Sequence, residues 1–419
     1  LIPRVVSAAE WRVVSEGVAQ RIRALEAFLA DVYDRGDIMR DGIVPKSLVT
    51  SSSHYHRQAH GIVPPNGVRI HVAGVDLVRD EVGKFYVLED NLRSPSGVSY
   101  VLENRRTLAH VVPEVFAGYR VSPVTEYPER LYRALAAAAP RDVHDPTVVV
   151  LTPGVYNSAH FEHAFLARRM GAELVEGRDL FCRGGFVYMR TTQGPQPVHV
   201  IYRRLDDEYL DPVQFRGDSV LGVPGLLNAA RAGAVTIANG VGNGVADDKA
   251  LYPYVPKIIE YYLGEKAILH NVATHDLTDP DVRAHVLERL DKMVIKPVDG
   301  SGGYGLVIGP KATEAELEEV AAAIIADPRS WIAQPVVTLS TSPTVGTGGA
   351  VQPRHLDLRP FAVNDGKKIW VLPGGLTRVA MNAGSLVVNS SQGGGSKDTW
   401  VLAGTGEEED GASLSAEAV

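Results

Sequence analysis

The sequence predicts a mixed α/β fold with several sheets, and three stretches carry that prediction. A buried strand over 147–151 runs through a Thr-Pro-Gly turn into a helix over 157–170, which is the building unit of an open α/β sheet. A hairpin is expected over 69–91, and a second strand pair, joined by a glycine-rich loop, over 293–308. Strands and helices are therefore interleaved along the chain, as in α/β and α+β proteins.

Length and composition describe a globular protein with more than one lobe. The chain has 419 residues, 45% hydrophobic and 22% charged, and this length usually divides into two or three lobes. Lysine and arginine number 42 against 50 acidic residues, so the net charge is −8 and no basic footprint for nucleic acid is present. No apolar run approaches the about 18 residues of a membrane span, and the opening stretch lacks a signal-peptide pattern. We expect a cytoplasmic enzyme with no nucleic-acid or membrane partner.

Cysteine usage excludes two kinds of site. With Cys182 as the one cysteine, the chain can form neither an intrachain disulfide nor a cysteine-rich zinc site. We expect Cys182 to be a small, partly buried apolar residue rather than a nucleophile.

The chain opens with a predicted scaffold helix. Ser7 and Glu10 form a capping box, and apolar residues recur at helical spacing from Trp11 to Val32, before the helix ends near Gly36. No chemistry is expected on it.

Three histidines follow within residues 50–61. His54, His56 and His60 invite a metal-binding interpretation, and the spacing of the last two fits one helix face. Because no acidic partner lies nearby in the sequence, we favour a polar loop.

The hairpin over 69–91 places oxygen ligands on one face. With strands of about 69–79 and 84–91, Asp76 lies opposite Glu89, and alternation puts Asn91 on the face of Glu89. Two carboxylates and a carboxamide suit Mg²⁺, which keeps waters and takes phosphate oxygens as further ligands. A solvated polar strand face is the equally weighted alternative.

The glycine-rich stretch near residue 300 predicts a phosphate-binding hairpin. A buried strand at 293–295 leads through Lys296 into Gly300-Ser301-Gly302-Gly303-Tyr304-Gly305, and a second strand follows at 306–308. The glycines match G-x-G-x-x-G, but a dinucleotide loop would lead into a helix, and a Walker loop would end in Gly-Lys-Ser/Thr. Backbone N–H groups of such a loop can wrap phosphates, with Lys296 as a point charge. The alternative is an ordinary tight hairpin with an exposed lysine.

The remaining pattern is coarser. The turn at residues 93–97 carries an arginine and two hydroxyls and fits a carboxylate or phosphate. Arg203 and Arg204 end a strand over 198–202 as candidate anion clamps, or as ion-pair partners of the acids that follow them. Helices are predicted over 126–139, 249–262 and from Thr313, where Glu316 completes a capping box; strands over 172–175, 331–337 and from 355; a loop over 340–352; and an acidic disordered tail over 404–419.

Taken together, these pieces resemble the circularly permuted ATP-grasp proteins of type 2, relatives of glutathionylspermidine synthase and eukaryotic glutathione synthetase. The likeness covers about residues 40–400, and its strongest motifs are the stretch 87–97 and Lys296-Pro297 with the glycine loop. It implies a glutathione-synthetase-like ATP-grasp fold with a glycine-rich lid. The expected divisions are 1–140 with the metal hairpin, 141–240 as substrate domain, 241–403 as ATP-binding lobe, and the tail over 404–419.

The resemblance also implies roles for individual residues. In the family a Glu-x-Asn pair and an upstream aspartate hold Mg²⁺, and these positions fall on Glu89, Asn91 and Asp76. Residues matching the ATP site are Lys249 (with Lys266 as a weaker competitor), Lys296, the loop residues Gly300, Ser301, Gly302, Gly303 and Tyr304, and Gln334, Val336 and Asp357. Residues matching substrate or transferred phosphoryl are Ser94, Ser96, Asn157, Arg203 and Arg378.

One departure from the family concerns an arginine. Glutathionylspermidine synthase places an arginine two residues before the metal-binding aspartate, where this chain has Gly74. We expect Arg93 to substitute, with Arg93 or Arg378 stabilising the charge that develops in the transition state.

The function implied is an ATP- and Mg²⁺-dependent carboxylate–amine ligase that forms an amide through an acylphosphate. Its substrates are expected to be a small-molecule or peptide carboxylate and an amine. The sequence leaves open whether the protein forms a homo-oligomer or binds a protein partner. A catalytically silent nucleotide-binding partner or scaffold on the same fold is the alternative, because fold does not determine function. A small-molecule kinase is a third hypothesis.

Overall fold

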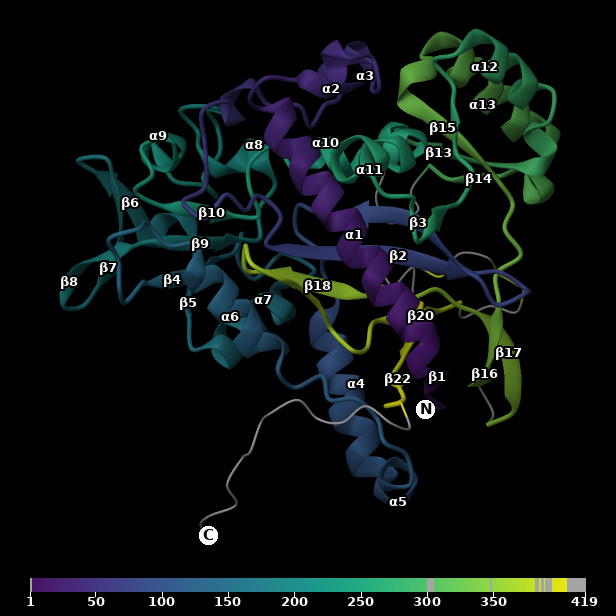
Figure 1. Cartoon of the computed structure of the whole chain (residues 1–419), viewed down its shortest axis with the longest axis horizontal. Helices are drawn as coiled ribbons and strands as arrows, with labels where there is room; N and C mark the ends of the chain where they lie inside the picture. The colour runs from purple at the N-terminus through teal and green to yellow at the C-terminus, as the bar shows by residue number, and fades with distance from the viewer. Residues whose placement is uncertain are drawn as a thin grey trace.

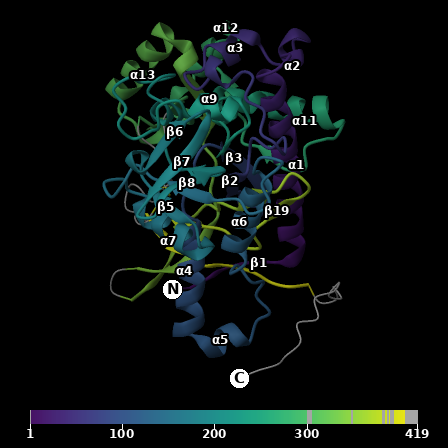
Figure 2. The ribbon, with the colours of Figure 1, turned by 90° about the vertical axis from the view of Figure 1, so that its left-hand side faces the viewer.

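The computed structural model describes residues 2–299, 305–346, 349–380, 384–385, 388 and 394–404. In Figure 1 a five-stranded sheet lies centrally, with a parallel sheet on one side of it. On the other side lies an antiparallel sheet that packs against α12 (Pro280–Leu287) and α13 (Glu314–Ala326). Figure 2 shows α4 (Val98–Val111) and α5 (Pro113–Ala117) extending from the body at the end opposite these two helices.

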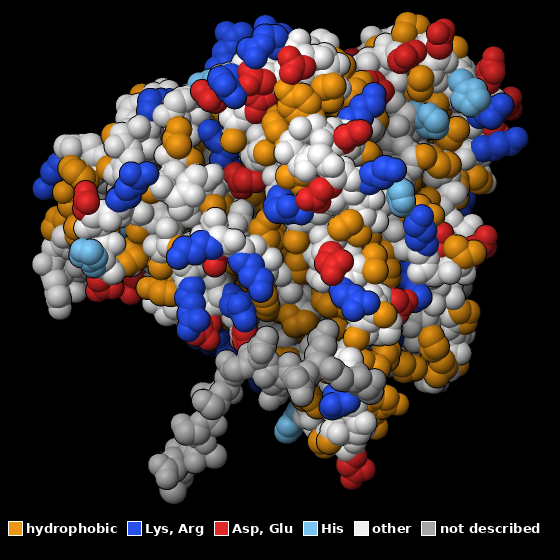
Figure 3. Space-filling view, viewed as in Figure 1, with side chains coloured by type: hydrophobic (Ala, Val, Ile, Leu, Met, Phe, Trp, Pro, Cys, Tyr) orange, Lys and Arg blue, Asp and Glu red, His pale blue; other side chains and the backbone are white. Residues whose placement is uncertain are grey.

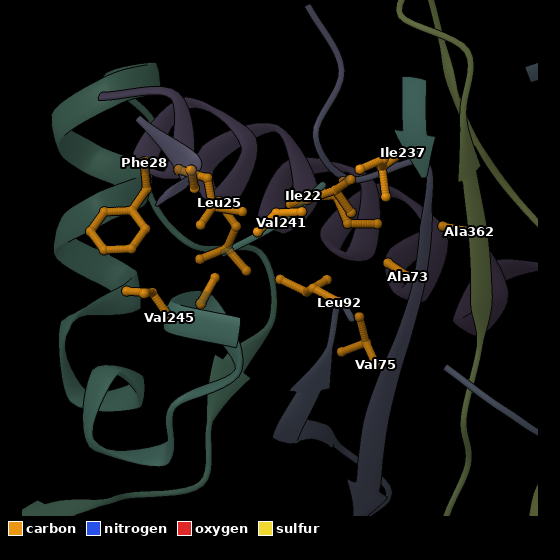
Figure 4. Packing of buried hydrophobic residues seen from close by; sticks show 14 of the residues in the cluster. Ile22, Leu25, Phe28, Ala73, Val75, Leu92, Ile237, Val241, Val245 and Ala362 are labelled. Carbon is orange, nitrogen blue, oxygen red and sulfur yellow. The ribbon is translucent and has the colours of Figure 1, made fainter. Parts of the chain in front are cut away.

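Helix α1 (Ala8–Val32) crosses the front of the central sheet in Figure 1. The capping box of Ser7 and Glu10 is confirmed, so the helix begins where the sequence predicts. Its apolar side chains form one core with residues from the hairpin and from the segment around 240. Figure 4 shows this contact through Ile22, Leu25, Phe28, Val75, Leu92, Val241 and Val245.

The central sheet has the strand order β11-β3-β2-β18-β19. Its strands are β11 (His270–Asn271), β3 (Phe85–Asn91), β2 (Val72–Arg79), β18 (Phe361–Asn364) and β19 (Ile369–Val371). The predicted hairpin register is confirmed, because Asp76 pairs with Glu89 and Gly74 pairs with Asn91. An irregularity between Asp76 and Leu77 shifts the register directly beside this pair, as bulges often do near functional sites.

The parallel sheet has the order β10-β9-β4-β5, with strands β10 (Thr236–Ala238), β9 (Val200–Arg203), β4 (Val148–Leu151) and β5 (Glu173–Val175). Helices α6 (Tyr127–Ala137) and α7 (His160–Met170) pack on it. Asn239, just past β10, joins this sheet to the hairpin. Its carboxamide accepts the backbone N–H groups of His71 and Val72 at 2.7 and 2.8 Å, and donates to the carbonyl of Leu92 at 2.9 Å.

The antiparallel sheet has the order β12-β15-β13-β14. Its strands are β12 (His275–Asp276), β15 (Trp331–Pro335), β13 (Met293–Pro297) and β14 (Val307–Ile308). The predicted strand–loop–strand arrangement around the glycines is confirmed by the pairing of β13 with β14. The Thr313–Glu316 capping box at the start of α13 is confirmed as well.

The other elements are short helices and the strands of small sheets. The helices are α2 (Asp37–Arg40), α3 (Lys46–Thr50), α8 (Asp207–Leu210), α9 (Leu226–Arg231), α10 (Gly244–Asp247) and α11 (Val255–Leu263). The 3-10 helices are η1 (Arg57–Ala59), η2 (Gly177–Asp179), η3 (Lys249–Tyr254), η4 (Leu290–Lys292), η5 (Gly309–Lys311) and η6 (Pro328–Ser330). The strands are β1 (Arg4–Val6), β6 (Leu180–Arg183), β7 (Phe186–Thr191), β8 (Gly194–Val198), β16 (Thr341–Val345), β17 (Val351–His355), β20 (Thr377–Val379), β21 (Gly395–Lys397) and β22 (Thr399–Val401).

Two sequence predictions need correction. The predicted loop over 340–352 is largely the antiparallel pair of β16 and β17, so the strand predicted to open at His355 instead ends there. The residues of β16 alternate between exposed and half-buried positions, which leaves no apolar alternation to detect. The helix predicted over 249–262 divides into η3 and α11, with Pro253 inside the first part.

The predicted domain division remains a prediction, but the topology bears on it. The ranges 1–140 and 241–403 both contribute strands to the central sheet, whereas the parallel sheet lies wholly within 141–240. Among the described helices, none combines the length and apolar character needed to cross a membrane. On the face in Figure 3, acidic and basic side chains lie interspersed. The tail over 405–419 lies outside the described residues.

The buried histidine His71 should make stability depend on pH. Both its ring nitrogens are buried without a hydrogen-bond partner, and burial lowers its pKa to about 4. In the unfolded chain this imidazole has the ordinary pKa of about 6.5, so the folded state has its full stability with respect to His71 above that pH. As the pH falls from 6.5 toward 4, the unfolded chain takes up a proton that the folded chain does not, and the unfolding free energy decreases by no more than about 1.4 kcal/mol per pH unit.

We predict that His71→Leu flattens the fall of unfolding free energy between pH 6.5 and 4.5, as measured by urea denaturation. His144→Leu, at an exposed histidine, is the control and should leave that slope unchanged. Equal slopes for all three proteins would contradict the assignment.

Candidate functional site

A charge cluster lies on the face of the central sheet where β2 and β3 pair. The buried carboxylate of Asp76 accepts two hydrogen bonds from Arg359, through Nε and, at 2.8 Å, through Nη2. It accepts a third from Nη2 of Arg378 at 2.7 Å. The Nε of Arg378 also donates to both oxygens of Asp357 at 3.0 Å, so this arginine joins two buried carboxylates. The sequence predictions for Asp76, Asp357 and Arg378 thus converge at one place.

Glu89 completes the cluster, and its pKa is shifted in the opposite direction from that of Asp76. Burial would raise the pKa of Asp76, but the charges of Arg359 and Arg378 outweigh it and hold that pKa well below the ordinary value. Burial and the neighbouring charge of Asp76 raise the pKa of Glu89 to about 7. The pKa values of these two neighbouring carboxyl groups are therefore shifted in opposite directions.

Arg359 occupies the space directly above Gly74. A Cβ built on Gly74 would lie 3.2 Å from Cδ of Arg359 and 3.0 Å from Cβ of Pro95. Arg359 reaches this position from the segment just before β18, whose Phe361 pairs with Gly74. Its Nη1 also donates to the carbonyl of Ser96 at 3.1 Å. The guanidinium therefore links Asp76 to the turn that carries the two serines.

Arg93 has other partners. Its Nε donates to Asp247 at 3.0 Å, and its Nη1 lies 3.6 Å from Asp206. Burial raises the pKa of Asp247 to about 6, with Arg93 acting against that rise. The arginines beside Asp76 are thus Arg359 and Arg378, while Arg93 contacts Asp206 after β9 and Asp247 at the end of α10. The prediction that Arg93 takes this place is wrong.

A second buried network holds Ser96 and the backbone of the 93–97 turn. Arg204 donates to Oγ of Ser96 at 2.7 Å and to the carbonyl of Pro95 at 3.0 Å, and it pairs with Glu162 at 3.3 Å. The hydroxyl of Ser94 is buried without a hydrogen-bond partner. An unsatisfied buried hydroxyl is uncommon and is the kind of group a bound ligand would satisfy.

The two predicted phosphate lysines approach the same region from different elements. Lys296 lies on β13, where burial lowers its pKa to about 8 and Glu89 opposes that change. Lys249 begins η3, and its Nζ donates to the carbonyl of Val298 at 3.2 Å. Lys266, the competitor of Lys249, is exposed. The predicted loop residues Gly300, Ser301, Gly302, Gly303 and Tyr304 lie outside the described residues.

The predicted adenine-side residues lie at the end of β15 and just after it. Gln334 is buried and pairs with Val294 of β13, and its Nε2 donates to Oγ1 of Thr274 at 2.9 Å. Val336 follows the strand and is half-buried. These positions lie on the same sheet as Lys296.

Two predicted substrate residues have local structural partners. Arg203 is fully buried and donates to the carbonyls of Asn239, Leu205 and Gly240, and it pairs with Asp207 at 2.8 Å. Asn157 is exposed in the turn before α7, where its Oδ1 accepts the N–H of Ala159 at 2.9 Å. The structure does not bring either residue to the Asp76 cluster.

The donor set of the hairpin fits a hard cation. Asp76 and Glu89 supply carboxylate oxygens and Asn91 a carboxamide oxygen, and the amide nitrogen of Asn91 is buried without a hydrogen-bond partner. Within the described part of the chain, no three His, Cys, Asp or Glu side chains lie close enough together to hold a metal ion. The histidines of residues 50–61 therefore do not form such a site.

Sequence reasoning missed Arg359 and the network of Arg204 with Glu162. Arg359 stands two residues after Asp357, which was the available signal, but its contact with Asp76 spans 283 positions in sequence. Glu162 accepts the N–H groups of Gly97 and Ser99 at 2.8 and 3.0 Å, at the start of α4. Nothing in the local sequence indicates that pairing.

Comparison with known proteins identifies the family to which the chain belongs. The profile described as circularly permuted ATP-grasp type 2 matches residues 3–380, and the chain belongs to that family. The fold resembles a glutathione synthetase-like effector from Globodera pallida, with a TM-score of 0.55 at 11% identity, covering 96% of this chain and 89% of the other. The predicted ATP-grasp fold is thereby confirmed, and the family supports an ATP-dependent ligase.

Sequence relatives extend over nearly the whole chain. An uncharacterised protein of Mycobacterium tuberculosis is 64% identical over 403 residues, which cover 96% of this chain and 73% of that protein. One from Synechocystis is 53% identical over 97% of this chain and 84% of the relative. A Frankia casuarinae protein named "Putative glutamate--cysteine ligase 2-2" is 46% identical over 96% of this chain but 46% of its own length.

The shared space of Gly74 and Arg359 generates a prediction about stability. Arg359→Ala leaves the buried carboxylate of Asp76 with fewer partners and should cost about 3–5 kcal/mol in urea unfolding. Gly74→Arg alone should also destabilise, because its Cβ would meet Arg359 and Pro95. In the double variant the new arginine can enter the vacated space. Its loss of unfolding free energy should therefore be smaller than the sum of the two single-variant losses, by about 0.5–3 kcal/mol. Additive costs would contradict the shared site.

Arg133→Ala provides the control for this cycle. Its ion pair with Glu129 is exposed on α6, so its removal should cost less than about 1 kcal/mol.

Proposed function

We propose that the protein is an ATP- and Mg²⁺-dependent carboxylate–amine ligase that forms an amide through an acylphosphate. One observation carries the proposal: two arginines from distant segments converge on Asp76 beside Glu89, on the face reached by Lys296. Such a cluster offers positive charge for phosphate oxygens and hard oxygen ligands for a cation within one site. The family match supports the same class of reaction.

The residues present would hold the nucleotide and the cation as follows. Lys249 and Lys296 would contact the outer phosphates, and Gln334 and Val336 would line the adenine side. Asp76, Glu89 and Asn91 would hold Mg²⁺, which supplies charge neutralisation at the phosphate oxygens. The glycine loop at 300–305 would close over the site and exclude water.

The protein's own side chains would then act by position and charge. The turn with Ser94 and Ser96 orients the substrate carboxylate for attack on the terminal phosphate. Arg359 and Arg378 stabilise the charge that develops on the transferred phosphoryl group, because both are fixed in place by Asp76 and Asp357 before substrate arrives. Excluding water protects the acylphosphate until an amine displaces phosphate.

The substrates proposed are amino acids or short peptides. The name of the Frankia relative refers to glutamate and cysteine, which bear the carboxylate and amine that this reaction joins. That relative extends well beyond the region shared with this chain, so its named activity is carried over here only as a proposal. A cytoplasmic location remains a prediction.

The direct test measures ADP and phosphate release with Mg-ATP against a panel of amino acids, short peptides and polyamines, with mass spectrometry of the products. A product lighter than the sum of its substrates by one water establishes ligation and names them. A stable phosphorylated product instead would indicate a kinase. Nucleotide binding with no turnover on any mixture would favour the silent scaffold.

The metal assignment predicts the behaviour of Glu89→Gln. This change removes an anionic ligand while keeping shape, so turnover should be abolished while thermal unfolding stays close to that of the parent protein. Glu81→Gln, in the exposed turn of the same hairpin, is the matched control and should keep full activity. Normal turnover by Glu89→Gln would remove Glu89 from the metal site.

A further inference from the structure

The three histidines of residues 54–60 have different surroundings. The Nε2 of His60 lies 2.8 Å from the hydroxyl of Tyr55, and the Nε2 of His56 lies 3.5 Å from Asp207. His54 is half-buried, and its ring makes no hydrogen bond to any described residue. Its imidazole is therefore the one in this loop that is left available to a ligand.

His54 packs against the end of the segment that Arg93 also contacts. A Cβ built on Gly244 would lie 2.7 Å from Cβ of His54 and 2.9 Å from Cδ of Arg93. Both side chains thus meet at the start of α10, and only a glycine leaves them room. Arg93 is the first residue of the 93–97 turn, so His54 packs near the residue at which the proposed carboxylate site begins.

The charged groups that face His54 come from several elements, and each adjoins a proposed binding element. They are Arg93 at the start of the 93–97 turn, Asp299 before the glycine loop, Asp248 before Lys249, and Asp207 at the start of α8. Burial, together with the charge of Arg93, lowers the pKa of His54, although the three carboxylates oppose the shift. The imidazole is thus neutral at neutral pH and can accept a proton.

We propose that His54 is the general base that takes the proton from the attacking amine in the second half of the ligation. This inference rests on the proposed function. The carboxylates around it, including Asp206 with a 61% exposed side chain, would attract a cationic amine to this side of the site. A base must lie within hydrogen-bond reach of the proton it removes, and the ring has no competing partner among the described residues.

The step balances without any further reactant. The lone pair of the unprotonated amine forms the C–N bond to the acyl carbon. The bond from that carbon to the phosphate oxygen breaks, and phosphate leaves with the electron pair. The nitrogen gives one proton to the imidazole of His54, which passes it to solvent.

The two halves of the reaction can be separated experimentally with hydroxylamine. Hydroxylamine is largely unprotonated at neutral pH and traps acylphosphates without a strong base. For His54→Ala and His54→Gln we expect amide formation to fall about 10²–10⁴-fold, the contribution typical of general bases. Hydroxamate formation, ADP release in the presence of hydroxylamine, and ATP binding should stay within about twofold of the parent values. Free imidazole should restore part of the amide rate to His54→Ala, and the low-pH limb of the parent rate profile should be lost in both variants.

His60→Gln is the matched control from the same loop, because glutamine can keep a hydrogen bond to Tyr55, and it should leave both rates unchanged. An unchanged amide rate in the His54 variants would overturn the assignment. So would equal losses of hydroxamate and amide, which indicate a structural role. If the parent protein itself makes neither product from any substrate mixture, the proposed function fails, an outcome that the parent assay separates from failure of the base assignment.

Discussion

The burial of Asp76 is the constraint on which the site depends. A carboxylate removed from water costs several kcal/mol unless charged hydrogen-bond donors replace the solvent. Here the donors come from Arg359 and Arg378, which lie 283 and 302 positions away in sequence. Folding of the hairpin and of the segment before β18 is therefore coupled: neither can bury its charges favourably without the other. The same coupling leaves both guanidinium groups oriented before any ligand binds.

The site lies where the three larger sheets meet, and a few polar groups hold this junction. Asn239 binds the backbone of both hairpin strands from the end of the parallel sheet. On the other side, Arg329 pairs with Asp248 at 2.6 Å, next to the lysine that contacts Val298. Groups from each sheet can thus act on one ligand, which suits a reaction whose catalysis consists mainly of positioning and charge. The parallel sheet is thus joined to the central sheet by hydrogen bonds between the Asn239 side chain and the backbone beside β2 and β3.

Much of the fold and part of the site could be predicted because the signals are local. Turn residues and alternation determine the register of Asp76 with Glu89, and capping boxes mark where α1 and α13 begin. The partners of these residues could not be predicted in the same way. Arg93 adjoins the serine turn in sequence but contacts Asp247, because the choice of ion-pair partner is made by tertiary packing. The β16–β17 hairpin was missed for a different reason, since its short polar residues bury no apolar face.

Gly74 and Arg359 show how a glycine on one strand leaves room for a side chain that arrives from the neighbouring segment. Strands β2 and β18 are neighbours, and Phe361 pairs with Gly74, so a long side chain from position 359 reaches the surface above position 74. An arginine on β2 would crowd this space, whereas a glycine there leaves room for the guanidinium to arrive from the adjacent segment. Asp76 needs a guanidinium within hydrogen-bond distance, and the segment that supplies this group does not matter. Asp76, Asp357 and Arg378 could therefore be proposed from the resemblance, whereas Arg359 had to be located in space.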